Sequence, residues 1–146
     1  MKTVAHILES KRERTVYTIA PEASVLDAVQ RMAERGVGAL LVLEGEKIAG
    51  IVTERDYARK MILRGRSSND TPVRDIMTSP VMYVRPDQSN EECMKLMTEN
   101  RLRHLPVMYD GKLIGLISIG DLVKDIISEQ QFIIEQLEHY ITGQRA

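Results

Sequence analysis

The sequence predicts a mixed α/β (α+β) protein built from two copies of one β-α-β-β-α unit, with an extended C-terminal helix. The chain has 146 residues, a length that fits one domain or two small ones that share a core. Shifting the chain by 65 residues superposes residues 18–57 on residues 83–122 without a gap and with nine identical pairs. Two copies, rather than the three or more that a solenoid needs, predict two repeats related by a pseudo-twofold axis.

Each copy begins with a short apolar segment that predicts a strand, at residues 16–19 and 81–84. A helix start follows, because Ser24 and Ser89 each precede an acidic residue by three positions, the spacing of a capping box. Apolar residues then recur three and four positions apart, as on one face of a helix. Two strands and a second helix complete each copy. The predicted strands are 39–43 and 48–53 in the first copy, and 105–108 and 113–118 in the second.

The turns and linkers divide the chain into three parts. Asp110-Gly111 is a strong hairpin signal, because both residue types tolerate a positive φ angle. The polar residues 65–72 predict a loop. We therefore assign residues 1–66 to the first repeat with its N-terminal segment, 67–130 to the linker and second repeat, and 131–146 to a C-terminal helix extension. A preamble also repeats, since residues 4–10 resemble residues 73–79 at a shift of 69.

The last helix continues far beyond Asp121. Ile127, Ile134 and Ile141 recur every seven residues and are flanked by further apolar side chains. Such a broad apolar stripe has to be covered by another surface. Two interpretations remain open: the helix packs on its own domain, or it packs against a second subunit.

Composition excludes several classes of protein. A net charge of −1 argues against a general nucleic-acid binder, which usually carries a basic surplus. No run approaches the 18 apolar residues of a membrane span, and the first residues lack the apolar core of a signal peptide. The single cysteine, Cys93, suits a reducing compartment and is expected in the core. We therefore expect a soluble, cytoplasmic protein without a membrane contact.

The residue inventory also argues against metal binding and catalysis. Three histidines lie far apart and are accompanied by one cysteine, so no metal-ligand spacing is present. No nucleophile elbow, P-loop or dinucleotide-binding glycine motif occurs. The charged residues Lys11–Arg14 predict a solvated loop; the alternative is a segment that lies over a ligand phosphate.

Candidate chemistry lies where the last strand of each copy ends, at Thr53-x-x-Asp56 and Ser118-x-x-Asp121. One interpretation is purely structural, because this spacing before a helix is also a capping box. The other is a ligand site, because α/β proteins bind ligands at the carboxyl ends of strands. A carboxylate there suits a ribose diol, whereas a hydroxyl and a helix N-terminus suit a phosphate.

These residues resemble a known family. The endings Gly50–Asp56 and Gly115–Asp121, each Gly-x-x-[Thr/Ser]-x-x-Asp, and the segment 103–107 (Arg-His-Leu-Pro-Val) look like a tandem CBS domain pair, or Bateman module, of the stand-alone signal-transduction type. The resemblance extends from about Val4 to Ile127. It implies a regulatory module that binds adenosine-containing ligands such as AMP, ADP, ATP, NAD or S-adenosylmethionine in two clefts between the repeats. It also implies that modules pair into a disc-like dimer.

The resemblance assigns residues to each cleft by matching position. The first cleft would contain Thr53, Arg55, Asp56, Arg59, Val81, Met82, Arg103, His104 and Pro106. The second would contain Val16, Tyr17, Val37, Gly38, Ala39, Ser118, Gly120 and Asp121. Since all the nearby cations are expected in the first cleft, we predict that it prefers anions and that the second takes mainly the nucleoside part or stays empty. The alternative is that these arginines are simply solvated.

The leading hypothesis is a nucleotide sensor without catalytic activity, catalytic cofactor or metal. Its expected partners are an adenine nucleotide, a second copy of the chain and an unidentified downstream protein, with no nucleic acid. The alternative is a dimeric interaction or scaffold protein whose clefts are non-functional and whose C-terminal helix carries the function.

Overall fold

The computed structural model describes residues 2–12 and 14–142. The chain forms two compact units, which are named here by their sheets. The three-stranded unit contains residues 15–83 and 110–112, and the two-stranded unit contains the described residues of 2–14, 84–109 and 113–142. These two units are defined by the contacts within each of them. The boundaries expected after residues 66 and 130 are based on the sequence repeat, and they differ from the boundaries of these units. Glu13 and the last four residues of the expected helix extension lie outside the described residues.

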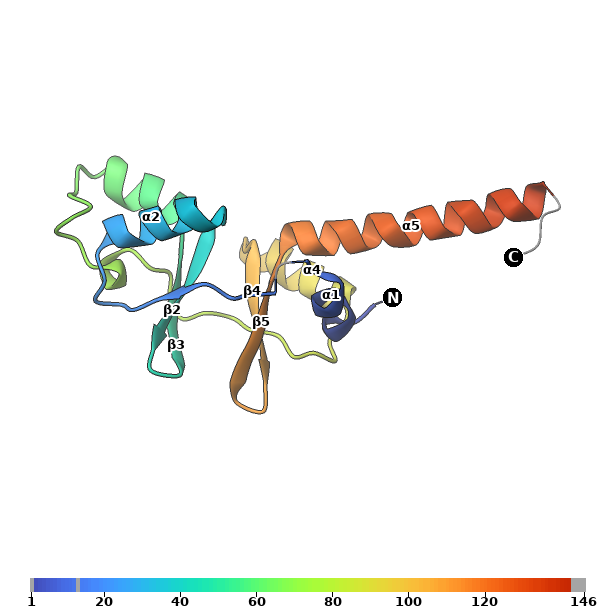
Figure 1. Ribbon diagram of the computed structural model, residues 1–146, viewed down its shortest axis with the longest axis horizontal. Helices are drawn as coiled ribbons and strands as arrows, with labels where there is room; N and C mark the ends of the chain where they lie inside the picture. Colours follow the sequence, from blue (N-terminus) through green and yellow to red (C-terminus); the bar gives the residue numbers. More distant parts are fainter. Residues whose placement is uncertain (1, 13, 143–146) are drawn as a thin grey trace. The chain divides into compact units, whose positions relative to one another are not determined.

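The three-stranded unit carries the first sequence repeat (Figure 1). Its first elements are β1 (Thr18–Ile19), α2 (Val25–Arg35), β2 (Ala39–Glu44) and β3 (Lys47–Thr53). The sheet order is β1-β2-β3, with β1 parallel to β2 and β3 antiparallel to it. The predicted strand 16–19 is therefore present, but only its last two residues have strand geometry.

The second helix of the first repeat is irregular. It begins as the four-residue α3 (Glu54–Tyr57) and continues as the π-helix η1 (Ala58–Ile62). After the predicted loop, a 3₁₀ turn, η2 (Val73–Asp75), completes this unit. The predicted second helix is therefore present, but its second half is a π turn, which the sequence pattern does not indicate.

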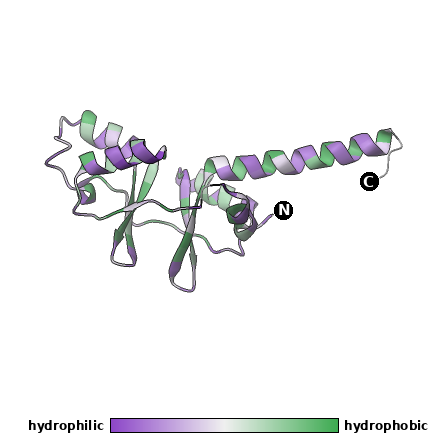
Figure 2. Ribbon diagram, viewed as in Figure 1, coloured by the Kyte–Doolittle hydropathy of each residue, from purple (hydrophilic) through white to green (hydrophobic). Residues whose placement is uncertain are grey.

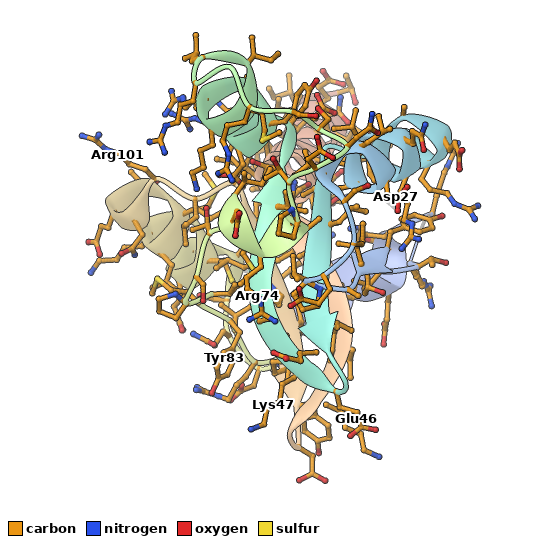
Figure 3. All side chains as sticks on the ribbon, turned by 90° about the vertical axis from the view of Figure 1, so that its left-hand side faces the viewer. Asp27, Glu46, Lys47, Arg74, Tyr83 and Arg101 are labelled. Carbon is orange, nitrogen blue, oxygen red and sulfur yellow. The ribbon has the colours of Figure 1, made fainter. Side chains whose placement is uncertain are left out.

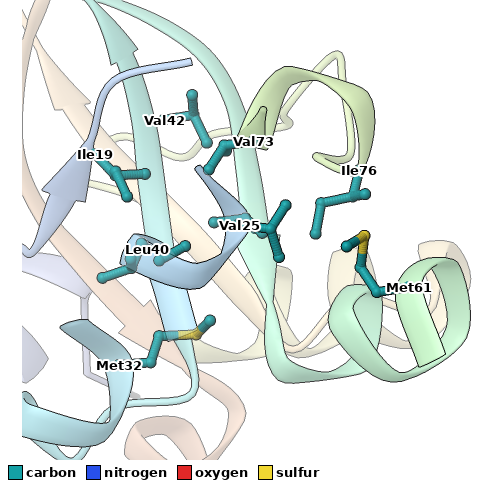
Figure 4. Packing of buried hydrophobic residues seen from close by; sticks show 10 residues of the cluster. Ile19, Val25, Met32, Leu40, Val42, Met61, Val73 and Ile76 are labelled. Atoms are coloured by element: carbon teal, nitrogen blue, oxygen red, sulfur yellow. The ribbon is translucent and has the colours of Figure 1, made fainter. Parts of the chain in front are cut away.

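One apolar core holds the three-stranded unit together (Figure 4). Side chains from β1, α2, β2, η1 and η2 meet in this core. Figure 4 labels eight of them, and each of these is at most 3% exposed. That set is Ile19, Val25, Met32, Leu40, Val42, Met61, Val73 and Ile76. Burial of this kind contributes about 1.5–3 kcal/mol per large aliphatic side chain.

The two-stranded unit carries the second repeat and the first helix of the chain (Figure 1). Its elements are α1 (Val4–Ser10), α4 (Asn90–Asn100), β4 (His104–Tyr109), β5 (Lys112–Ser118) and α5 (Ile119–Ile141). Its core is built from Val4, Ile7, Val84, Cys93, Met97, Leu105, Val107, Ile117 and Leu122. The expected core position of Cys93 is confirmed.

The prediction of a strand at residues 81–84 is wrong, and Pro106 explains why. In the first copy, Leu41 N donates to Tyr17 O at 3.1 Å and extends the parallel pairing beside β2. Pro106 is the residue that aligns with Leu41, and proline has no N–H to donate. Only Val84 keeps the pairing, through an isolated parallel bridge to Val107.

The two copies of the preamble, residues 4–10 and 73–79, contribute matching side chains to the two apolar cores. Val4 and Ile7 of α1 are buried in the two-stranded unit, while the matching Val73 and Ile76 are buried in the three-stranded unit. Each compact unit therefore contains the preamble that lies next to the other sequence repeat. The predicted similarity of residues 4–10 and 73–79 corresponds to equivalent buried positions, even though one segment is an α-helix and the other a 3₁₀ turn.

The polar turns follow the predicted chemistry. Asp110 and Gly111 both have positive φ angles, of 52° and 74°. In the three-stranded unit, Figure 3 shows Glu46 and Lys47 at the tip of the β2–β3 hairpin. Arg74 of η2 donates from Nε to Glu22 Oε1 at 2.8 Å, an exposed interaction of small energetic value.

The C-terminal helix does not pack along its length on its own chain. Leu122 and Asp125 are the buried residues of α5. Beyond them, Ile127, Ile134 and Ile141 are 50%, 52% and 80% exposed. Figure 2 shows apolar bands recurring along the whole helix. The interpretation that this stripe is covered by its own domain is therefore wrong for the segment after residue 126.

The two glycines that open the repeated endings differ in what surrounds them, and this predicts unequal mutant stabilities. A Cβ at Gly50 would lie 2.9 Å from the backbone oxygen of Thr78, whereas the three heavy atoms nearest to a Cβ at Gly115 all belong to the side chain of Leu8. The Met77 side chain, which lies even nearer to that Cβ, can move, but the backbone oxygen cannot rotate away. We therefore expect Gly50→Ala to lower the free energy of unfolding by about 1–3 kcal/mol. Gly115→Ala should cost less.

Urea unfolding of the two variants tests this difference. Gly120→Ala is the control, since its Cβ would meet only the Ser118 hydroxyl at 3.6 Å and alanine favours a helix. Equal losses for Gly50→Ala and Gly115→Ala would contradict the argument.

Candidate functional site

The two candidate turns have the same internal geometry. Thr53 Oγ1 accepts a hydrogen bond from Asp56 N at 3.1 Å, and Asp56 Oδ2 accepts one from Thr53 N at 3.0 Å. In the second copy the corresponding distances between Ser118 and Asp121 are 3.2 and 2.8 Å. Both turns are thus complete capping boxes, and the structural interpretation is confirmed. The ligand role of these turns stays a prediction.

The other two predicted capping boxes are only half formed. Ser24 and Ser89 cap α2 and α4 with their hydroxyls, each at 3.1 Å from the accepted N–H. Among the described residues, neither cap has the return bond from the acidic side chain. Glu92 Oε2 instead accepts from Gln88 Nε2 at 3.2 Å. The complete boxes are therefore those at the candidate turns.

Asp56 is enclosed by polar partners within the three-stranded unit. Its Oδ2 also accepts from Thr53 Oγ1 at 3.1 Å, and its Oδ1 accepts from Thr78 Oγ1 at 3.2 Å. Lys60 Nζ lies 3.1 Å from the same Oδ1 and donates to Ile76 O at 2.9 Å. Asp56 is only 8% exposed, so these donors stabilise a charge that burial would otherwise penalise.

Asp121 has a lysine partner too, but from a distant part of the chain. Lys11 Nζ lies 2.9 Å from Asp121 Oδ2 and donates to Leu116 O at 2.8 Å. The expectation that Lys11 belongs to a solvated loop is therefore wrong. Lys11 also differs from the expectation that all nearby cations belong to the first cleft, because its partner Asp121 is assigned to the second cleft.

His104 is held in its neutral form near these charges. Burial lowers the pKa of His104 below 6.5, and Lys11 and Arg103 lower it further, while Asp121 acts in the opposite direction. The imidazole is therefore a neutral hydrogen-bonding group near neutral pH.

Each unit contains residues assigned to both predicted clefts, joined by equivalent bonds. Glu54 N, after Thr53, donates to Gly38 O at 3.1 Å in the three-stranded unit. Ile119 N, after Ser118, donates to Arg103 O at 2.9 Å in the two-stranded unit. The two halves of each predicted cleft lie in different units, and their convergence stays a prediction.

The remaining predicted residues differ in exposure. Arg55, Arg59, Arg103 and Gly120 are exposed, as is Met82 at 40%. Ala39 and Pro106 are buried within strands, and Val16, Val37 and Val81 are half-buried. The ring of Tyr17 lies 5.3 Å from the guanidinium carbon of Arg35, a cation–π contact within its own unit.

Sequence reasoning missed three residues around the two carboxylates. Lys60 stands four positions after Asp56, and this spacing on a helix could have indicated the pair. Thr78 and Lys11 lie 22 and 110 positions from their carboxylate partners. No local signal connects such residues, because only the packing of the preambles brings them to the turns.

The described part of the chain offers neither a metal-binding cluster nor an activated thiol. No group of three or more His, Cys, Asp or Glu side chains there could hold a metal ion. Burial and the nearby Glu92 raise the pKa of Cys93 to about 11, so its thiol stays protonated. None of the described helices is long and apolar enough to cross a membrane.

Comparisons with known proteins identify relatives along most of the chain. The family model for the CBS domain matches residues 10–63 and again residues 73–128. The mitochondrial CBS domain-containing protein CBSX3 of Arabidopsis thaliana is 40% identical over 97% of this chain and 72% of its own length. The protein YhcV of Bacillus subtilis, also CBS domain-containing, is 30% identical over 79% of this chain and 81% of its own length.

The solved structures to which this chain is similar also include CBS-domain proteins. A signal-transduction protein with CBS domains from Burkholderia ambifaria superposes with a TM-score of 0.85 and 61% identity, covering 88% of this chain and 96% of that one. A hexameric CBS-CP12 protein from bloom-forming cyanobacteria superposes with a TM-score of 0.74 and 32% identity, covering 83% of this chain and 70% of that one.

The environment of His104 predicts a pH dependence of stability. Because its pKa is lowered in the folded state, the unfolded chain binds the proton first as pH falls below 6.5. This contribution to stability is complete above that pH and is lost as pH falls toward the folded pKa. We expect His104→Gln to lose less unfolding free energy than the wild type between about pH 7.5 and pH 5.5.

Denaturant unfolding at the two pH values measures this difference. His139→Gln is the matched control, because His139 is exposed on α5. If His104→Gln and the wild type lost the same stability on acidification, the argument from burial would be refuted.

Proposed function

Since the chain belongs to the CBS-domain family as a tandem pair of repeats, we propose that this regulatory, signal-transduction module binds an adenine nucleotide: AMP, ADP, ATP or NAD. Binding changes the conformation of the module, and a downstream protein responds to that change. The module performs no catalysis and needs no catalytic cofactor or metal. The observation that supports this proposal is the pair of Ser/Thr-x-x-Asp turns, each with an ordered carboxylate at a strand-to-helix junction.

The chemistry of these turns suits a nucleoside phosphate. A carboxylate accepts hydrogen bonds from both hydroxyls of a ribose, and charge-assisted bonds of this kind are about twice as strong as neutral ones. The exposed Arg55, Arg59 and Arg103 can neutralise phosphate. Val81, Met82, Val16 and Tyr17 offer apolar surface to the adenine.

The bonds between neighbouring segments suggest how binding is transmitted. Gly38 O accepts from Glu54 N, and Arg103 O accepts from Ile119 N. In each unit, a segment assigned to one cleft is thereby fixed to the turn assigned to the other. A ligand that moves the turn in one cleft therefore also moves a segment of the other cleft. A structural element shared in this way can couple the two sites.

We also propose that the module is a homodimer in a reducing compartment such as the cytoplasm. Ile127, Ile134, Leu137 and Ile141 are at least half exposed on α5. With Ile127 at a heptad a position, Leu137 falls at d, and this choice of residues favours two-stranded coiled coils. The same face supports the alternative function, a dimeric scaffold whose clefts bind nothing.

Thermal unfolding separates the sensor from the scaffold. AMP at about 100 times its Kd should raise the unfolding free energy by roughly 2.7 kcal/mol, because it binds only the folded state. The expected result is an increase in melting temperature with AMP, ADP, ATP or NAD. If none of the four moved the melting temperature, the sensor would be rejected in favour of the scaffold.

The dimer has its own test. Ile134→Glu places a charge in the exposed apolar stripe and should convert a dimer into a monomer in analytical ultracentrifugation. Gln136→Glu adds the same charge at an exposed position outside the a and d series and should leave the dimer intact. A monomeric wild type, or a dimeric Ile134→Glu variant, would show that α5 does not form the interface.

A further inference from the structure

The single phenylalanine of the chain lies outside the apolar stripe of α5. Phe132 is 62% exposed. With Ile127 at a heptad a position, Phe132 falls at f, on the side of the helix opposite the a and d side chains of the proposed dimer. Pairing of two α5 helices through the stripe therefore leaves this ring exposed, and aromatic rings are enriched where proteins bind one another.

The helix around Phe132 is acidic. Glu129 and Glu135 stand three positions before and after Phe132, a spacing that places them on the same side of the helix. Residues 126–142 contain three glutamates and no lysine or arginine. Phe132, Glu129 and Glu135 are named here the outer face of α5, and their charge favours a basic partner surface.

A second exposed apolar group, on the three-stranded unit, has the opposite charge around it. At the end of η1 the side chain of Met61 is buried, whereas Ile62 and Leu63 are 62% and 78% exposed. Residues 59–66 contain four basic residues and no acidic one. The apolar pair is thus surrounded by positive charge, as Phe132 is by negative charge.

Two of these four cations are available to a partner. Lys60 and Arg66 each pair with an aspartate of their own unit, at 3.1 and 2.9 Å. Arg59 and Arg64 are exposed, and neither forms an ion pair with another described residue. Arg64 is assigned to neither predicted cleft. Ile62, Leu63 and Arg64 are named here the η1 surface.

We propose that the outer face of α5 in one copy binds the η1 surface of another copy, so that dimers associate into larger assemblies. Phe132 packs against Ile62 and Leu63, and the glutamates lie beside Arg64. Both surfaces are exposed in the single chain, so the partner is another copy. The two surfaces differ, which makes the contact heterologous and able to continue from one dimer to the next.

The strength of the assembly comes from making several small contacts at once. Exposed ion pairs contribute little to affinity, so the apolar side chains supply most of it and the charges select which surfaces meet. A dimer presents two copies of each surface, and a second contact forms at the high effective concentration that the first one creates. The inference therefore rests on the proposed α5 dimer.

Analytical ultracentrifugation of the full chain at increasing concentration tests the contact. The wild type should form species larger than a dimer, and about 0.5 M salt should weaken them by screening the charges. Phe132→Ser and Leu63→Ser should each lower the association constant of dimers about tenfold, the effect of one lost apolar contact. Both positions are exposed, so the fold and the dimer should persist in these variants.

An exchange of charge tests whether the two surfaces bind each other. Arg64→Glu and Glu135→Arg should each weaken the association of dimers, and a double variant that carries both should recover it to within about threefold of the wild type. Lys47→Glu is the matched control, because it makes the same change of charge at the exposed tip of the β2–β3 hairpin (Figure 3). It should leave the association unchanged.

Losses in both serine variants together with recovery in the double variant would support the proposal. A wild type that stays dimeric at about 1 mM, a loss confined to one of the two surfaces, no recovery in the double variant, or an equal loss in Lys47→Glu would overturn it and leave the α5 dimer standing. A wild type that is monomeric throughout would refute that dimer as well.

Phosphatidylserine vesicles provide the test against another occupant of the η1 surface. The proposal predicts that the wild type and Leu63→Ser sediment with the vesicles to the same small extent. Binding of the wild type but not of Leu63→Ser, without assembly in solution, would assign the surface to anionic lipid headgroups and would overturn the proposal.

Discussion

The structure depends on the reciprocal bond between a hydroxyl residue and an aspartate at each strand-to-helix turn. Thr53 with Asp56, and Ser118 with Asp121, satisfy N–H groups that a helix start leaves without a partner. The same bond fixes the direction in which β3 and β5 give way to helices. It also holds a carboxylate at the end of each hairpin, so the element that stabilises the turn is the one that can bind a ligand.

Each carboxylate then needs a cation, and the chain provides it from two unrelated places. Lys60 follows Asp56 on the next turn, whereas Lys11 reaches Asp121 from the N-terminal segment. Both lysines also donate to a backbone carbonyl. Both repeats thus pair the capping aspartate with a lysine, but the two lysines do not occupy equivalent sequence positions. A buried carboxylate needs a cation beside it, and that cation can come from any part of the chain.

The two repeats differ in the strand beside their hairpin and in their last helix. Pro106 removes one N–H from β4, so the strand beside it shortens to the single bridge at Val84. At the ends of the repeats, one helix turns irregular at η1 while the other continues as α5 to Ile141. The second repeat therefore has the shorter strand pairing and the more regular last helix, and that helix keeps an uncovered apolar face.

The sequence alone determined the fold class, through the repeat at a shift of 65 residues. It also determined the four helix caps, the Asp110-Gly111 turn and the long last helix, since each of these follows from residues a few positions apart. The buried positions shared by the two preambles could also be aligned, because Val4 and Val73 repeat one pattern. Only the tertiary structure decided which preamble packs into which unit, and therefore that Lys11 and Thr78 lie beside Asp121 and Asp56. Such contacts join residues far apart in the chain, and their energy comes from packing that no local periodicity encodes.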